Sequence, residues 1–388
     1  MTDLKEKKRI LIVNGHLRTG GVERSLITLL HNLDYSKFDV DLLLLEDKGE
    51  YFDLLPKEVN VIFRPITRAY GPLFGTIHEA IKNRDWFSVK YRLVLLRSKL
   101  FGLQVFGNLK NAFTDQNKYD LSIGYRSGIS TVIAGFACDA KKRITWWHHG
   151  EINVGSSYAD EVSTMDQIIT VSNSIRKKLA DSFSELNKKM ITIPNAISLE
   201  EIYKKAGENI GNIDVSKPVI VSIGRLSPEK NYQKAIEAAR ILKDKRIEYN
   251  WYFIGDGEER EIINDMVLKE SLNDCVHLTG SLSNPYPYLK HAQVFVHPST
   301  IESQGISVLE ALALNVPVVA VQNDGVSEFL EDENNSLVVE NNADSIAQAI
   351  EDLMLSPDLY AQIKRNCILP APYRTEVQLK KIDEVFQS

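Results

Sequence analysis

The feature that most constrains this chain is an alternation of short apolar runs with helical segments, repeated through both halves of its 388 residues. Residues 9–15 form an apolar run of strand length rich in branched side chains, and residues 20–33 then carry apolar residues at helical spacing. Strands that alternate with helices predict βαβ units and parallel sheets.

The pattern stops once and then begins again. Residues 204–218 are polar and contain glycine, which is typical of a linker. We therefore expect an α/β chain of two Rossmann-like domains whose parallel sheets face a central cleft, with boundaries at 1–200 and 201–370 and a C-terminal helix, 371–388, packing back on the N-terminal domain. Ligands bind at the carboxyl ends of parallel strands, so the cleft is the expected site. The expected strands are residues 9–15, 38–46, 60–64, 119–126, 143–149, 167–172 and 190–195, then 219–226, 251–257, 276–280, 292–298, 317–322 and 336–340.

Charge and cysteine content exclude several classes of protein. A net charge of −6 provides no global basic field for nucleic acid, so no nucleic-acid partner is expected. Cys138, Cys275 and Cys367 lie far apart without metal-ligand spacing, which favours free thiols in a reducing compartment. The first residues do not resemble a signal peptide, and no run is apolar enough to span a bilayer. We expect a cytoplasmic protein.

Two cations follow the first strand of the C-terminal half. Arg225 stands at the end of that strand, and Lys230 comes just before the next helix. An arginine can bind two oxygens of an anion at once, while a lysine acts as a movable point charge. Both residues could instead be solvated loop cations, but their strand-end position favours binding of an anionic ligand.

Two glutamates flank an expected helix start in an apolar stretch, residues 297–320. We place that start at Ser303, Gln304 and Gly305, where free N–H groups favour phosphate. If the eight residues that follow Glu302, up to and including Glu310, were helical, they would span roughly 12 Å, which fits a nucleotide-sugar from its sugar to its ribose. The alternative is one solvated capping residue and one surface glutamate.

These motifs, in this order, resemble the family-four retaining glycosyltransferases of the GT-B fold. The resemblance rests on Glu302 and Glu310 with seven residues between them, on residues 222–231 upstream and on the glycine-rich residues 14–26, and it covers nearly the whole chain. It implies transfer of a sugar from a nucleotide-sugar, most simply a UDP-sugar, to a glycan or lipid-linked glycan acceptor. It also implies retention at the anomeric carbon, no metal and no other cofactor.

The resemblance also assigns roles to residues. Arg225 and Lys230 would neutralise the departing diphosphate, Glu302 would contact the donor sugar and Glu310 the ribose. His148, or else His149, matches the family's active-site histidine near the transferred sugar. The implied catalytic residues are His148, Arg225, Lys230 and Glu302, and the implied donor-binding residues are Gly20, Gly21, Arg225, Lys230, Glu302, Ser303, Gln304, Gly305, Ile306 and Glu310.

The sequence departs from the family pattern in two places. The family often has an aromatic residue where Gln304 stands, and its usual turn differs from residues 194–198. Other features are set aside: Asp39 and Asp41 lie at a strand start rather than its end, residues 255–260 predict a strand-to-helix turn rather than a dinucleotide loop, and core packing is the better interpretation of Trp146–Trp147.

One basic segment, residues 81–113, stands out in an acidic chain. It carries Asp85 as its one acid and interleaves aromatic residues with the cations Lys82, Arg84, Lys90, Arg92, Arg97, Lys99 and Lys110. Two interpretations stay open: contact with the surface of the inner membrane face, or a helical insertion with a solvated basic face.

Two other functions of the protein also stay open, a GT-B-fold nucleotide-sugar epimerase and a non-catalytic sugar-nucleotide-binding partner subunit.

Overall fold

The protein is described from a computed structural model, which covers residues 7–18, 20–46, 48–66, 73–110, 112–114, 118–149, 157–209 and 213–388. Its contacts divide the chain into an N-terminal unit, Met1–Ile193 with Leu379–Ser388, and a C-terminal unit, Pro194–Gln378. The division after Ile193 precedes the boundary expected at residue 200. The expected linker also begins inside a helix, because α7 spans Leu199–Ala206.

A parallel seven-stranded sheet forms the centre of the N-terminal unit, in the order β3-β2-β1-β4-β5-β6-β7. The central strand β1 pairs with β2 on one side and β4 on the other, so that Ile10 lies opposite both Val40 and Leu121. The strand order therefore reverses direction between β1 and β4, which is the position where open parallel sheets bind ligands. The strands are β1 (Lys8–Asn14), β2 (Phe38–Leu44), β3 (Asn60–Phe63), β4 (Tyr119–Gly124), β5 (Ala140–Trp147), β6 (Gln167–Thr170) and β7 (Met190–Thr192).

Helices of the N-terminal unit begin where the sequence supplies caps. Asp85 accepts a hydrogen bond from Ser88 N (3.0 Å) at the start of α3, and Ser172 accepts one from Ile175 N (3.3 Å) at the start of α6. The helices are α1 (Gly21–Asn32), α2 (Leu73–Lys82), α3 (Trp86–Phe101), α4 (Ile129–Val132), α5 (Ser157–Glu161) and α6 (Asn173–Ser182), with 3-10 turns at Glu50–Leu54, Leu103–Leu109 and Ser184–Lys189 and a π-helical turn at Ile133–Ala137.

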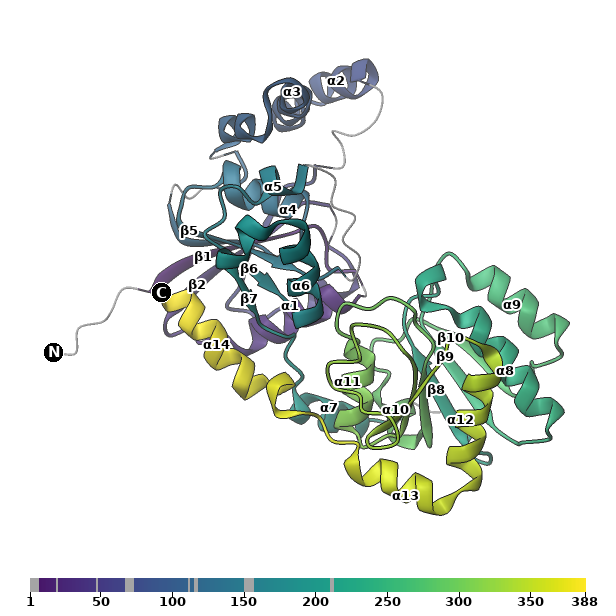
Figure 1. The fold of residues 1–388 in the computed structure, drawn as a ribbon. Helices are drawn as coiled ribbons and strands as arrows, with labels where there is room; N and C mark the ends of the chain where they lie inside the picture. Colours follow the sequence, from purple (N-terminus) through teal and green to yellow (C-terminus); the bar gives the residue numbers. More distant parts are fainter. Residues whose placement is uncertain are drawn as a thin grey trace. The chain divides into compact units, whose positions relative to one another are not determined.

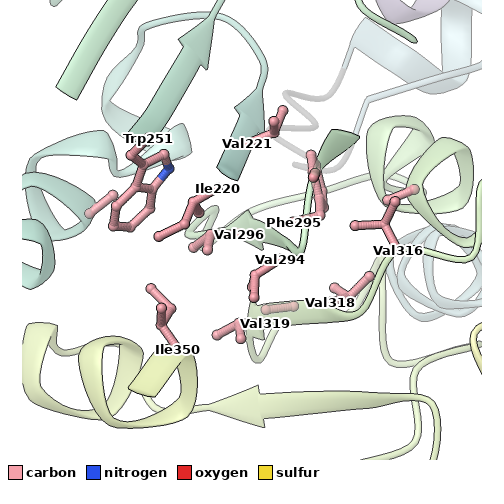
Figure 2. Packing of buried hydrophobic residues seen from close by; sticks show 14 of the residues in the cluster. Ile220, Val221, Trp251, Val294, Phe295, Val296, Val316, Val318, Val319 and Ile350 are labelled. Atoms are coloured by element: carbon pink, nitrogen blue, oxygen red, sulfur yellow. The ribbon is translucent and has the colours of Figure 1, made fainter. Parts of the chain in front are cut away.

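The C-terminal unit repeats the design with a six-stranded parallel sheet, in the order β10-β9-β8-β11-β12-β13. Its core fills with branched and aromatic side chains such as Ile220, Trp251 and Phe295 (Figure 2). Trp251 also donates its ring N–H to Ser222 Oγ (3.1 Å), which satisfies a polar atom in the core. The strands are β8 (Val219–Ile223), β9 (Asn250–Ile254), β10 (Val276–Gly280), β11 (Val294–His297), β12 (Val318–Val321) and β13 (Ser336–Val339).

The last helix returns the chain to the N-terminal unit. Helices of the C-terminal half are α7, α8 (Tyr232–Asp244), α9 (Arg260–Lys269), α10 (Tyr286–His291), α11 (Ile306–Ala313), α12 (Ala343–Leu355), α13 (Pro357–Asn366) and α14 (Thr375–Gln387). Figure 1 draws α14, the last of them, in yellow. Ile382, Val385 and Phe386 of α14 belong to the core of the N-terminal unit. The Phe386 ring meets Phe38 edge-on at 5.9 Å, and Lys142 donates to Val385 O (2.9 Å).

Most of the sequence predictions about the fold are confirmed. Each expected strand has a counterpart, and the chain has two parallel sheets with helices. Trp146 and Trp147 are buried in the core, and residues 255–260 form the turn from β9 to α9. Asp41 serves structure, since it accepts hydrogen bonds from Asn60 and Tyr119 (2.7 Å each). Within the described ranges, no helix has the length and apolar character needed to cross a bilayer.

Candidate functional site

The loop after β8 carries the first candidate residues. Arg225 is exposed, while the next two residues, Leu226 and Ser227, are buried. Gly224 lets this loop pack closely, because a Cβ there would lie 2.8 Å from the Tyr232 hydroxyl. The loop after β9 also requires a glycine, because Gly255 has φ +149° and a Cβ there would lie 1.8 Å from Gly224 O. The sequence therefore holds Arg225 at the carboxyl edge of the sheet with its side chain in solvent.

Lys230 and Glu302 form an ion pair at this edge, although 72 residues separate them in the chain. His297, the buried last residue of β11, places Nε2 3.1 Å from Glu302 Oε1. Burial raises the pKa of the Glu302 carboxyl, but Lys230 and His297 outweigh burial and lower that pKa to about 2. Glu302 is therefore an ionised carboxylate held by two partners.

Backbone bonds join the loops that carry this pair. Thr300 N and Ser299 Oγ both donate to Glu229 O, at 3.0 and 3.1 Å. Gly325, after β12, has no side chain because a Cβ would lie 2.6 Å from Glu302 Cβ. Loops after β8, β11 and β12 thus converge at one edge of the sheet and fix the position of Glu302.

Helix α11 begins later than the sequence predicts. We expected its start at Ser303–Gly305, but the helix spans Ile306–Ala313 and Gly305 caps it with φ 73° and ψ 55°. This left-handed conformation favours glycine. The estimate of roughly 12 Å from eight helical residues is therefore wrong, because Glu302–Gly305 are not helical.

Gln304 is engaged by the protein itself. Its Oε1 accepts hydrogen bonds from both N and Nδ2 of Asn195 (2.8 Å each), and its Nε2 donates to Asn195 O (3.3 Å). Asn195 lies in residues 194–198, so the two departures from the family pattern bond to each other. Both side chains are buried, which makes the pair a structural element of the C-terminal unit.

Glu310 is buried in the second turn of α11 with 2% of its surface exposed. Tyr286, itself buried in α10, donates its hydroxyl to Glu310 Oε1 (2.9 Å). The alternative of a solvated capping residue and a surface glutamate is therefore wrong for both residues. Burial of a carboxylate requires such partners.

In the N-terminal unit, His148 follows β5 and is 5% exposed. Its ring lies 4.9 Å from Tyr125 and stacks on Trp146 at 6.1 Å. Burial, then His149 and Arg126, lower the pKa of His148 to about 3, and burial and Arg126 also lower the pKa of His149. Among the described residues, His148 Nε2 has no hydrogen-bond partner. His148 is therefore a neutral, buried imidazole.

Sequence reasoning missed a charged cluster next to this histidine. Arg126 Nη1, after β4, lies 3.3 Å from Glu23 Oε1 and 3.4 Å from His16 Nε2, and His16 Nδ1 lies 3.6 Å from Glu23 Oε1. Glu23 is buried in the first turn of α1. Gly20 is required beside it, since a Cβ there would lie 2.5 Å from Glu23 Oε2. Arg126 could have been found by the argument that identified Arg225, a cation at a strand end.

The two units thus hold the predicted residues in two sets. The C-terminal unit brings Lys230 and Glu302 together and keeps Arg225 at the same edge, whereas Glu310 is satisfied by Tyr286. Gly21 opens α1 in the N-terminal unit. Within the part of the chain that the structure describes, no three His, Cys, Asp or Glu side chains group closely enough to hold a metal ion.

Comparisons with known proteins show which enzymes this chain resembles. Residues 204–368 match the model of the glycosyl transferases group 1. The chain is 27% identical over 354 residues, 90% of its length and 91% of the relative's, to N-acetylgalactosamine-N,N'-diacetylbacillosaminyl-diphospho-undecaprenol 4-alpha-N-acetylgalactosaminyltransferase of Campylobacter jejuni. It is 30% identical over 174 residues to an uncharacterized glycosyltransferase of Methanocaldococcus jannaschii, where the match spans 43% of each chain.

A solved structure supports the fold. The crystal structure of HepE from Anabaena in complex with UDP-glucose matches with a TM-score of 0.73 and 16% identity, over 98% of this chain and 99% of that one. This chain is therefore a glycosyltransferase with the GT-B fold, and its residues 204–368 match the model of the group 1 glycosyl transferases.

Proposed function

We propose that the protein transfers a sugar from a UDP-sugar to a glycan acceptor with retention at the anomeric carbon and without a metal ion. The observation that carries this proposal is the cluster of Lys230, Glu302 and His297, with Arg225 exposed beside it. It combines cations suited to a diphosphate with an ionised carboxylate suited to sugar hydroxyls. HepE, whose solved complexes contain UDP and UDP-glucose, supports UDP as the nucleotide.

In the proposed reaction, the bond from the anomeric carbon to the β-phosphate oxygen breaks, and a bond from that carbon to an acceptor hydroxyl oxygen forms. The acceptor hydroxyl passes its proton to an oxygen of the departing β-phosphate, which releases it to solvent, so that UDP carries one more negative charge than it did within the UDP-sugar. Arg225 and Lys230 stabilise that charge because both are cations at the same sheet edge. Glu302 accepts hydrogen bonds from the hydroxyls of the sugar. Lys230 then exchanges part of its ion pair with Glu302 for contact with the diphosphate.

His148 contributes a neutral imidazole to the proposed reaction. With its pKa lowered to about 3, the ring carries no charge at neutral pH and can donate or accept a hydrogen bond at the transferred sugar. The relative of Campylobacter jejuni is named for a diphospho-undecaprenol acceptor, which supports a lipid-linked glycan as the acceptor here. The epimerase and the non-catalytic subunit receive no comparable support.

Titration calorimetry with UDP tests the assignment of the two glutamates. Glu310→Ala should weaken UDP binding by about 10- to 100-fold, since a hydrogen bond to a charged group contributes roughly 1.5–3 kcal/mol. Glu302→Ala should leave UDP affinity intact and impair the UDP-sugar or its transfer. Tyr286→Phe is the matched control, because it removes the hydrogen bond to Glu310 and keeps the carboxylate.

Unchanged UDP affinity in Glu310→Ala, with a loss of stability like that of Tyr286→Phe, would make Glu310 a structural residue.

A separate assay tests whether the reaction needs a metal ion: turnover should persist in EDTA. Strict dependence on added Mg²⁺ or Mn²⁺ would contradict it.

A further inference from the structure

The outer face of α3 presents large apolar side chains to solvent at regular spacing. We define this outer face as Trp86, Lys90, Leu93, Arg97 and Leu100, whose intervals of four and three residues place them on one side of a helix. Trp86 is 65%, Leu93 48% and Leu100 80% exposed. Apolar and basic residues therefore alternate along one exposed stripe.

The opposite face of α3 is firmly packed. Tyr91 and Val94 are buried, and the ring of Tyr91 lies edge-on to Phe106 at 6.2 Å. Phe87 meets Phe113 edge-on at 5.2 Å. The orientation of the helix is thus fixed by this aromatic cluster, and Figure 1 shows α2 and α3 next to each other at the border of the N-terminal unit. Because Tyr91 and Val94 pack against the protein, the opposite side of α3 is the side that is turned to solvent.

Charge favours one kind of partner for this face. Helix α3 contains no acidic residue, and its N-cap Asp85 is bonded to Ser88 through both carboxylate oxygens (3.0 and 2.7 Å). The protein as a whole carries −6, so the local surplus of cations opposes the overall charge. The exposed cations of residues 81–110 are Lys82, Arg84, Lys90, Arg97, Lys99 and Lys110.

We infer that the outer face of α3 is a docking surface for an anionic lipid bilayer. A helix that lies in the membrane interface needs an apolar stripe to enter the acyl boundary and lysines or arginines to meet lipid phosphates. Trp86 is suited to the headgroup level, and Leu93 and Leu100 to the acyl boundary. The inference goes beyond the proposed transfer reaction, since it concerns a different surface and requires neither donor nor acceptor.

Co-sedimentation of the full chain with vesicles tests the inference. Vesicles of phosphatidylcholine with phosphatidylglycerol should bind the protein, vesicles of phosphatidylcholine alone should bind it at least tenfold more weakly, and salt should weaken binding. Leu93→Ser with Leu100→Ser, and separately Lys90→Glu with Arg97→Glu, should each lower the binding constant at least tenfold. The matched control is Leu268→Ser with Leu355→Ser, because these leucines of α9 and α12 are 59% and 65% exposed.

A full chain that does not bind anionic vesicles would overturn the inference, as would outer-face variants that bind like the unmodified protein. A control pair that loses binding equally would also overturn it. The melting temperature with and without UDP shows that each variant is folded, and it separates the two proposals. Vesicle binding without a UDP-induced shift would contradict only the proposed donor.

Discussion

The carboxyl ends of the two sheets collect charged groups in different ways. In the C-terminal unit, Lys230 and Glu302 lie on loops joined by backbone hydrogen bonds, and the carboxyl has its pKa lowered to about 2. In the N-terminal unit, His148 is buried beside the cluster of His16, Glu23 and Arg126, and its pKa is lowered to about 3. The Glu302 carboxylate is therefore charged at neutral pH, and the His148 ring is neutral. The difference is consistent with the proposed electrostatic role of Lys230 and Glu302 and the proposed hydrogen-bonding role of His148.

The largest effect is expected from removing a cation at the carboxyl ends of the strands in the C-terminal unit. Lys230→Ala should reduce kcat by about two to three orders of magnitude, since removal of one donor that stabilises transition-state charge costs about 3 kcal/mol. Steady-state kinetics with a radiolabelled UDP-sugar measures the effect. Lys234→Ala is the matched control, because Lys234 is paired with Glu237 (2.7 Å) in the next helix. Turnover of Lys230→Ala near that of the control would remove Lys230 from the reaction.

The second test concerns the link between Asn195 and Gln304. Asn195→Ala should destabilise the C-terminal unit by about 1–3 kcal/mol, because it leaves the buried amide of Gln304 short of a partner. Denaturant unfolding of Asn195→Ala, Gln304→Leu and the double variant gives the coupling energy. We expect the double variant to be about 1 kcal/mol more stable than the sum of the single changes predicts. Additive losses would show that the two side chains act independently.

The smallest expected effect is on how the stability of the fold depends on pH, because His148 and Glu302 titrate in different pH ranges. The pKa of His148 is lowered in the fold, so the unfolded chain binds the additional proton and stability falls as pH drops from about 6.5 towards about 3. Glu302 also has a lowered pKa, and its contribution is lost only between about 4.5 and about 2. Acidification from pH 7.5 to 5.5 should thus cost about 1 kcal/mol through His148 and nothing through Glu302.

Thermal unfolding of His148→Gln at both pH values measures that difference. The variant should lose less stability than the unmodified protein over this interval, because glutamine does not titrate. An equal loss in both proteins would show that His148 is already solvated or charged in the fold.

The sequence determined the fold class and the short motifs. Branched apolar runs alternating with helical patterns predicted the strands, because burial on both faces of a parallel sheet requires such runs. Arg225, Lys230 and Glu302 could also be predicted as candidate site residues, since Arg225 and Lys230 follow a recognisable strand and Glu302 precedes a recognisable helix. Motifs of this kind are local, so they can be recognised from the order of neighbouring residues without the tertiary structure.

Only the tertiary structure decided which residues meet. Glu302 pairs with a lysine 72 residues away, Gln304 bonds to an asparagine 109 residues away, and Arg126 reaches Glu23 across 103 residues. Local patterning does not specify such distances, because they depend on which strands become neighbours in the sheet. The physical reason is burial: a polar group removed from water needs a partner, and the fold, rather than the neighbouring sequence, provides it.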